Sequence, residues 1–240
     1  MKSVFIEKSL GVDIREGSVS LTLVGKKLRT VEVLAGKTIA LKPLTGKDEK
    51  AEKHFLTKVN RFLIDHDTWP ESVVVSLPRS YVTFKTFELP APDLESVRSM
   101  VEFELERQFS AGLEDLYFTF QVTPKAENVF HVASAAIKKE IANYYLELVQ
   151  KLNLKTTILD VSTFANVNLA FAQDIENDSP IWALADISPE TLDIALIKND
   201  AIEFSRSLSW ARPAIKDANS GKISDPAQLE NLSREITKSI

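Results

Sequence analysis

Two aspartates, Asp13 and Asp186, each end a run of apolar residues and precede a short polar turn. A carboxylate at the end of a strand can hold a magnesium-bound water, while backbone amides of the adjacent turn bind phosphate. The same position also suits a plain turn residue that hydrogen-bonds its own backbone. Both interpretations stay open for either aspartate alone. Two of them in similar settings, far apart in the chain, favour a shared ancestral design.

The residues that follow the two aspartates predict the same structure twice. Val19, Leu21 and Leu23 alternate with polar residues, which is typical of a half-buried strand after Asp13. After Asp186 the pattern again predicts a hairpin, and we interpret the two triplets of strands as an internal repeat. Strands are expected near 4–14 and over 18–23, 28–34, 39–41, 72–77, 81–89, 116–122, 129–136, 155–159, 181–187, 191–197 and 201–208. Helices are expected over 45–66, 94–109, 138–152, 162–172 and 229–240.

The segment from residue 81 to 136 therefore has the order strand, helix, strand, strand. On its helix the sequence places five apolar residues in one stripe: Leu94, Val97, Val101, Leu105 and Phe109. Phe103 lies opposite that stripe with Met100 beside it. An apolar pair on the far face indicates either a partner surface or packing under another part of the chain. The predicted partner-binding residues are Met100, Glu102, Phe103 and Glu106.

Composition excludes several classes of protein. The chain of 240 residues is 44% hydrophobic and has no cysteine, which rules out disulfides and thiolate chemistry. The net charge of −5 argues against a nucleic-acid partner, because such proteins carry a basic excess. No apolar run reaches membrane-spanning length, and the N-terminus does not read as a signal peptide. The histidines and glycines match no metal or P-loop motif, so we expect no metal site.

In the order and spacing of its motifs the chain resembles the actin-like superfamily. Within it the chain is most similar to cytoplasmic proteins of bacterial pilus and secretion machines, namely PilM, the cytoplasmic domain of GspL and FtsA. The first phosphate loop is matched by residues 11–14 with Gly17 and Ser18, and the second by 186–188 with Thr191. Further matches lie at 76–79, 87–90, 101–106, 114–118, 205–208 and 234–240.

The chain departs from the family in both phosphate loops. In the first loop, Arg15 occupies the position at which the family has glycine. In the second loop, that position is occupied by Ser188, which is followed by Pro189. A side chain obstructs the approach of the backbone to phosphate, and proline removes an amide donor. Arg15 could instead offer its guanidinium to a phosphate. The resemblance therefore implies a vestigial nucleotide site of Asp13, Arg15, Gly17, Ser18, Asp186, Ser188 and Thr191, with no cofactor expected beyond weak ATP and Mg²⁺.

The resemblance implies an α/β fold with two actin-like (ribonuclease H-like) lobes, the second incomplete, and an inserted subdomain. We expect the first lobe over 1–80 and 154–176, the insert over 81–153, and the partial second lobe over 177–240, with the chain continuing beyond residue 240. It further implies a cytoplasmic, non-enzymatic scaffold at the bacterial inner membrane, in type II secretion or type IV pilus assembly. Its implied partners are a motor ATPase, platform proteins of the membrane and a second copy of the chain. The alternatives are an active ATP-binding PilM-like protein that holds a partner's N-terminal peptide, and an FtsA-like membrane-tethered polymer.

Overall fold

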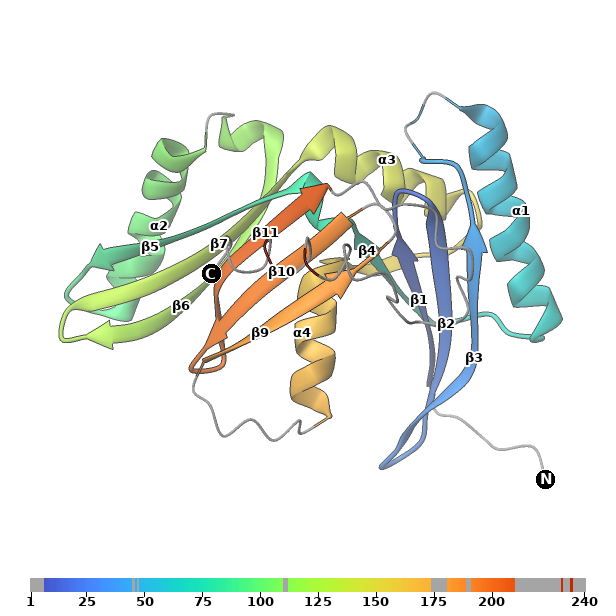
Figure 1. Ribbon diagram of the computed structural model, residues 1–240, viewed down its shortest axis with the longest axis horizontal. Helices are drawn as coiled ribbons and strands as arrows, with labels where there is room; N and C mark the ends of the chain where they lie inside the picture. The colour runs from blue at the N-terminus through green and yellow to red at the C-terminus, as the bar shows by residue number, and fades with distance from the viewer. Residues whose placement is uncertain are drawn as a thin grey trace. The chain divides into compact units, whose positions relative to one another are not determined.

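The computed structural model describes residues 7–44, 46, 48–109, 112–173, 181–188, 191–209, 230 and 234. The chain, whose helices and strands are drawn in Figure 1, divides into two compact units that are each assembled from separate segments. The first unit comprises Met1–Val82, Leu105–Phe118 and Ala136–Asn166, and the second comprises Thr83–Glu104, Thr119–Ala135 and Val167–Ile240. The domain boundaries expected from the sequence stay a prediction.

The first unit contains a five-stranded mixed sheet in the order β3-β2-β1-β4-β8. Its strands are β1 (Glu7–Ile14), β2 (Ser18–Lys26), β3 (Val31–Ala40), β4 (Ser72–Leu77) and β8 (Thr156–Val161). The first three are antiparallel to one another, whereas β1, β4 and β8 run parallel. Parallel neighbours need a crossover, and the chain between β3 and β4 supplies one with helix α1 (Glu49–Asp65).

Alternation gives this sheet one apolar face and one more polar face. The apolar residues Leu10, Val12, Leu21, Val73 and Val75 are almost completely buried. Helices α1 and α3 (Lys139–Gln150), which Figure 1 shows beside the sheet, add further buried side chains. From α1 these are Phe55, Val59, Phe62 and Leu63, and from α3 they are Ala142, Tyr145, Leu148 and Val149.

Two buried hydroxyl groups of this unit form hydrogen bonds where distant chain segments meet. The Tyr145 hydroxyl donates a 2.7 Å hydrogen bond to the carbonyl oxygen of Leu44. Burial raises the pKa of Tyr145 well above its usual value, and it raises that of Tyr144 to about 12 with help from Glu52. The Ser162 hydroxyl likewise donates to the Leu77 carbonyl oxygen at 2.9 Å. These bonds connect α3 and the residue that follows β8 to earlier parts of the chain.

Two sequence-based predictions are wrong in this unit. The helix expected from residue 45 begins at Glu49, because Asp48 caps it by accepting hydrogen bonds from the amides of Lys50 and Ala51. The two strands expected over 28–34 and 39–41 form the single strand β3. Its register shifts so that Leu34 has no partner on β2, and this bulge lets the pairing continue past Gly36.

The insert has the predicted order of strand, helix, strand and strand. Its strands β5 (Val82–Pro90), β7 (Val129–Lys138) and β6 (Leu116–Ala126) form a sheet in that order, with helix α2 (Leu94–Gln108) between β5 and β6 in the chain. Asp93 accepts a 2.7 Å hydrogen bond from the Ser96 amide at the start of α2, which is typical of an N-cap residue, and this bond lowers the pKa of Asp93.

The apolar residues that were predicted to form one stripe on α2 are buried, except for the first of them. Val97, Val101 and Leu105 are fully buried and Phe109 is 8% exposed, but Leu94 is 48% exposed. Leu94 opens the helix, where the chain has only just left the Pro90–Asp93 turn. Phe103, on the opposite face, is 73% exposed, as the helical phase predicted.

The second unit also contains the antiparallel sheet β11-β10-β9. Its strands are β9 (Ile181–Ile187), β10 (Thr191–Lys198) and β11 (Ala201–Ser209), close to the predicted ranges. Helix α4 (Ser162–Ala172), whose bounds match the prediction, sends Val167 into a buried cluster with Ala195 and Ile197. The helix expected over 229–240 lies outside the described residues except for Glu230 and Arg234, which form a 3.2 Å ion pair.

Candidate functional site

A row of polar side chains crosses the whole five-stranded sheet of the first unit. Asp13 on β1 is paired in register with Ser20 on β2 and with Ser76 on β4. Ser20 is in turn paired with Thr38 on β3, and Ser76 with Asp160 on β8. Asp13, Ser76 and Asp160 stand near the carboxyl ends of the three parallel strands. That edge of an α/β sheet is where ligands commonly bind.

The members of this polar row are held in different electrostatic settings. The Ser20 and Thr38 hydroxyls share a 3.0 Å hydrogen bond on the antiparallel side. Ser76 is 7% exposed between the two carboxylates. Burial raises the pKa of Asp160, partly offset by a hydrogen bond from the Val161 amide. Of this row the sequence predicted only Asp13 as a site residue, because Ser76 and Asp160 lie inside apolar strands where no local pattern indicates ligand binding.

The second unit repeats part of this row. Asp186 on β9 is paired with Asp193 on β10, and Asp193 with Ser207 on β11. The order Asp186, Asp193, Ser207 therefore matches Asp13, Ser20, Thr38 strand for strand. Asp193 is 2% exposed and accepts a hydrogen bond from the Ser207 hydroxyl. The internal repeat predicted from the sequence is thus confirmed in the register of both sheets.

The turn after Asp13 is closed tightly by its own residues. The Arg15 amide donates a 2.8 Å hydrogen bond to the Ser18 carbonyl oxygen, and the Leu41 amide donates to the Gly17 carbonyl oxygen at 3.0 Å. The Arg15 side chain folds back, so that its Nε donates to Asp13 Oδ2 at 2.8 Å. Asp13 Oδ1 is buried and accepts no hydrogen bond within the described part of the chain. The predicted residues Asp13, Arg15, Gly17 and Ser18 therefore lie together in one turn.

The turn after Asp186 is closed by an equivalent backbone hydrogen bond, and the Ser188 side chain forms further hydrogen bonds within it. The Ser188 amide donates to the Thr191 carbonyl oxygen at 2.9 Å, the equivalent of the bond between Arg15 and Ser18. The Thr191 amide donates to Ser188 Oγ at 2.8 Å. The Ser188 hydroxyl also lies 2.9 Å from Thr191 Oγ1. An amide that a phosphate loop would leave open is therefore already bonded inside the turn.

The two turns belong to different units, so the predicted nucleotide-site residues form two separate groups. The first group is in the first unit, and Asp186, Ser188 and Thr191 are in the second. Pro189, which the sequence comparison also implicated, lies outside the described residues. No three His, Asp or Glu side chains gather as metal ligands within the described ranges.

The predicted partner-binding residues are all exposed on α2. Met100 is 39% exposed and Phe103 is 73% exposed, while Glu102 and Glu106 are exposed beside them. A phenylalanine with most of its surface in water is unusual for an isolated position and suits a contact with another molecule. Whether a partner binds there stays a prediction.

The described helices include none that is both long and apolar enough to span a bilayer.

The comparison with protein families identifies a pilus assembly family. The family model for type IV pilus assembly protein PilM matches residues 11–215, which includes both turns and the insert. No curated protein matches the chain at a significant level.

Two of the solved structures that match the chain are similar to it over most of its length. A chain of the PilM–PilN type IV pilus biogenesis complex superposes with a TM-score of 0.71 at 21% identity, over 85% of this chain and 62% of that chain. The cytoplasmic domain of EpsL, an inner-membrane component of the type II secretion system of Vibrio cholerae, gives a TM-score of 0.54 at 14% identity, over 84% and 71%. The present chain thus spans less than two thirds of the first of these. The predicted actin-like α/β fold class is confirmed.

Proposed function

Because this chain belongs to the type IV pilus assembly protein PilM family, we propose that it acts as a scaffold rather than as an ATPase. In this role it sits on the cytoplasmic face of the bacterial inner membrane. There it recruits a motor ATPase and connects it to platform proteins embedded in the membrane. The observation that carries the proposal is the state of the two turns that would hold a nucleotide.

The first turn has its carboxylate engaged by a cation of the chain itself. A magnesium-bound water needs the Asp13 carboxylate as an acceptor, but Asp13 Oδ2 already accepts from Arg15 Nε at 2.8 Å. The Arg15 guanidinium also brings positive charge to the place where a divalent cation would be held, and like charges repel. Binding of Mg-ATP would therefore have to break an ion pair whose arginine is only 17% exposed.

The second turn has its amide engaged by a serine hydroxyl. A phosphate oxygen would compete with Ser188 Oγ for the Thr191 amide, and the gain of one bond would be offset by the loss of another. Both turns thus use a side chain in place of glycine to satisfy groups that a nucleotide would otherwise bind. This common feature supports a structural role for the fold.

The partners follow from the two solved relatives. The first is a PilM–PilN complex, and the second is the cytoplasmic domain of an inner-membrane secretion component. We infer that this chain likewise binds a PilN-type membrane protein. The exposed face of α2, with Phe103 among glutamates, is a candidate contact for a basic surface of the motor ATPase.

One observation favours the alternative, an ATP-binding PilM-like protein. Asp13 Oδ1 is buried without a hydrogen bond in the described part of the chain. A buried carboxylate oxygen without a partner is stabilised when a water molecule or a cation binds it. Mg²⁺ would therefore find an available carboxylate ligand in Asp13 Oδ1.

Calorimetry separates the two functions. Titration of the chain with Mg-ATP and Mg-ADP should give no saturable heat at millimolar nucleotide. A dissociation constant of about 1 mM corresponds to a binding free energy of roughly −4 kcal/mol. A dissociation constant in the low micromolar range, about −8 kcal/mol, would establish the ATP-binding alternative instead.

A second measurement tests the scaffold role directly. The purified cytoplasmic segment of the PilN-type protein from the same organism should bind with the same affinity in the presence and absence of Mg-ATP. Partner binding that requires nucleotide would contradict a scaffold with degenerate phosphate turns.

A further inference from the structure

The hairpin of β2 and β3 carries an exposed apolar tip, formed by residues 24–33. The Lys27 amide donates a 2.8 Å hydrogen bond to the Thr30 carbonyl oxygen, which leaves Leu28 and Arg29 as the two central residues of the turn. Leu28 is 89% exposed, the highest value among the exposed large hydrophobic residues of the described chain. Val31 and Val33 follow it and are 66% and 71% exposed.

The tip extends beyond strands β4 and β8 of its own sheet. Strand β4 pairs with β1 only over Ser9–Asp13, whereas β1 and β2 stay paired as far as Glu7 and Lys26. The last turn of the hairpin is therefore reached by neither β4 nor β8. Figure 1 shows the hairpin continuing past the ends of those two strands.

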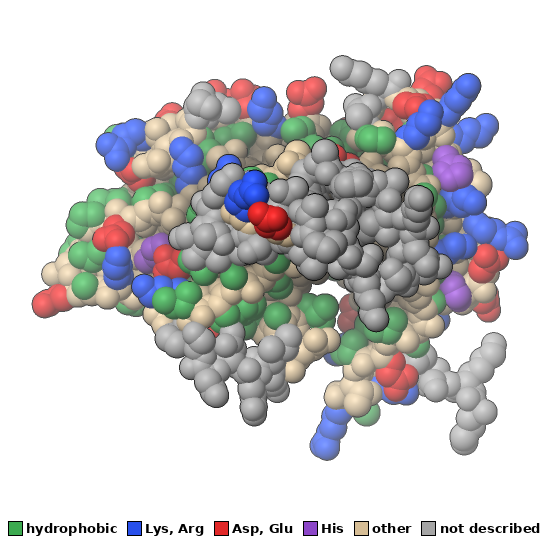
Figure 2. Space-filling model, viewed as in Figure 1, with side chains coloured by type: hydrophobic (Ala, Val, Ile, Leu, Met, Phe, Trp, Pro, Cys, Tyr) green, Lys and Arg blue, Asp and Glu red, His purple; other side chains and the backbone are tan. Residues whose placement is uncertain are grey.

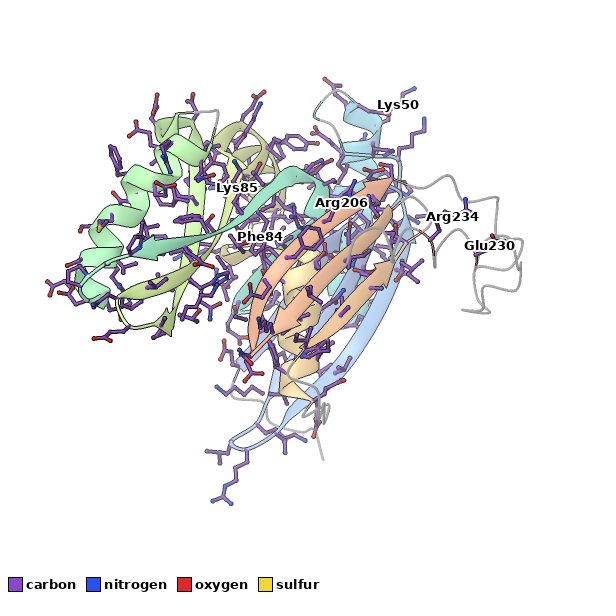
Figure 3. The ribbon with its side chains drawn as sticks, turned by 60° about the vertical axis from the view of Figure 1, so that its left-hand side comes forward. Lys50, Phe84, Lys85, Arg206, Glu230 and Arg234 are labelled. Atoms are coloured by element: carbon purple, nitrogen blue, oxygen red, sulfur yellow. The ribbon has the colours of Figure 1, made fainter. Side chains whose placement is uncertain are left out.

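The charge at the tip has the opposite sign to that of the chain. Residues 24–33 contain three basic side chains and one acidic side chain, namely Lys26, Lys27, Arg29 and Glu32. Lys27 forms an ion pair with Glu32. The whole chain has a net charge of −5. In Figure 2 a basic side chain projects from the end of this hairpin, and in Figure 3 side chains project outward from it.

An apolar residue at the apex of a turn with cationic side chains around it is typical of a segment that anchors a protein at the surface of a lipid bilayer. The apolar side chain enters the boundary between headgroups and acyl chains, and the cations meet anionic lipid phosphates. Nucleic acid would use the cations but has no need of an exposed leucine with two valines behind it. A protein groove is disfavoured because the tip is a narrow turn and not a face.

We propose that residues 24–33 form a membrane-docking tip that binds anionic lipid bilayers, with Leu28 inserted and with Lys26 and Arg29 on lipid phosphates. This binding does not depend on nucleotide or on any platform protein. One anchor of this size gives weak, reversible attachment, so it would orient the first unit on the bilayer and leave stable recruitment to other contacts.

Vesicle co-sedimentation tests the proposal with the full 240-residue chain. Vesicles of phosphatidylethanolamine with about one third phosphatidylglycerol should bind the chain, and phosphatidylcholine vesicles should not. Replacing Lys26→Gln together with Arg29→Gln keeps the pair of Lys27 with Glu32. It should weaken binding at least about fivefold, because each of the two basic residues contributes up to about fivefold near an anionic surface. Leu28→Ser should weaken it at least about threefold, because it removes the inserted apolar group.

Matched controls lie on α1 in the same unit. Lys50→Gln with Lys53→Gln removes the same charge, and Figure 3 shows Lys50 at the other end of this unit from the hairpin tip. Ile64→Ser removes an aliphatic residue that is 63% exposed. Both controls should bind vesicles like the parent chain, and circular dichroism melts should show all variants folded.

Three outcomes would overturn the proposal. The first is equal binding by the tip variants and the α1 controls, which would place the contact elsewhere. The second is the absence of binding to anionic vesicles at low salt. The third is parent-like vesicle binding by Leu28→Ser together with binding of the chain to heparin or RNA, which would identify a general polyanion site.

Discussion

Arg15 Nε donates a 2.8 Å hydrogen bond to Asp13 Oδ2, across a turn in which the two residues are separated by Ile14 alone. The pair is the counterpart of the bond between the Thr191 amide and Ser188 Oγ in the second unit. In both turns the residue in the place of a glycine bonds the group that a phosphate or its magnesium would use. Each of the two turns thus bonds one of its own polar groups with one of its own side chains.

Restoring glycine at both positions should restore some affinity for nucleotide. The double variant Arg15→Gly with Ser188→Gly releases the Asp13 carboxylate and the Thr191 amide. We expect Mg-ATP to bind at least about tenfold more tightly than to the parent, a gain of about 1.4 kcal/mol, measured by calorimetry. Without Mg²⁺ the gain should shrink, because the freed carboxylate acts through the metal.

The control for this gain is Arg29→Gly, which places glycine in the turn between β2 and β3 and should leave the affinity unchanged. A folded double variant that binds no more nucleotide than the parent would show that these two side chains are not what limits binding.

Phe103 and Leu105 lie two residues apart on α2 and should respond in opposite ways to truncation. Phe103 is 73% exposed and Leu105 is fully buried. Phe103→Ala should change the free energy of unfolding by no more than about 0.5 kcal/mol. Leu105→Ala should lower it by about 2–5 kcal/mol, because it removes buried methyl groups and leaves a cavity. Urea unfolding followed by circular dichroism measures both.

The same pair separates stability from binding. Phe103→Ala should weaken binding of the purified motor ATPase of the same pilus system at least about tenfold, which is typical of an aromatic anchor. If Phe103→Ala instead costs as much stability as Leu105→Ala, then the phenylalanine is packed inside and the α2 interface is wrong.

Asp160 should make the protein less stable as pH rises through its titration. Burial raises the pKa of Asp160, so the folded state binds a proton more tightly than the unfolded state does. Between its ordinary value of 3.8 and the raised pKa of the folded state, stability therefore falls with increasing pH. Asp160→Asn should raise the urea midpoint at pH 7, and the gain should shrink as pH approaches 4.

The control for this prediction is Asp115→Asn, since Asp115 is exposed on the first unit. Its urea midpoint should follow that of the parent at both pH values. An equal or lower midpoint for Asp160→Asn at pH 7 would show that the carboxylate forms a net stabilising interaction there.

The sequence by itself determined the secondary structure wherever the side-chain pattern was local. Helix α4 and strand β9 have the predicted bounds, and the insert has the predicted order of elements. Periods of 2 and 3.6 residues are written in neighbouring side chains, so they need no knowledge of the rest of the chain. Two aspartates with their turns, and the exposed Phe103, were likewise accessible because each depends on a short segment.

Only the tertiary structure decided which distant residues became neighbours. Ser76 and Asp160 stand beside Asp13 because β4 and β8 pair in parallel with a particular register, and a shift by one residue would turn them to the other face. The bulge at Leu34 joined two predicted strands into one for the same reason, since pairing with β2 outweighed the local break at Gly36. The direction of the Arg15 side chain toward Asp13 was also decided there. A free arginine samples many rotamers, and only a folded turn that holds the carboxylate within 2.8 Å fixes the one that forms the ion pair.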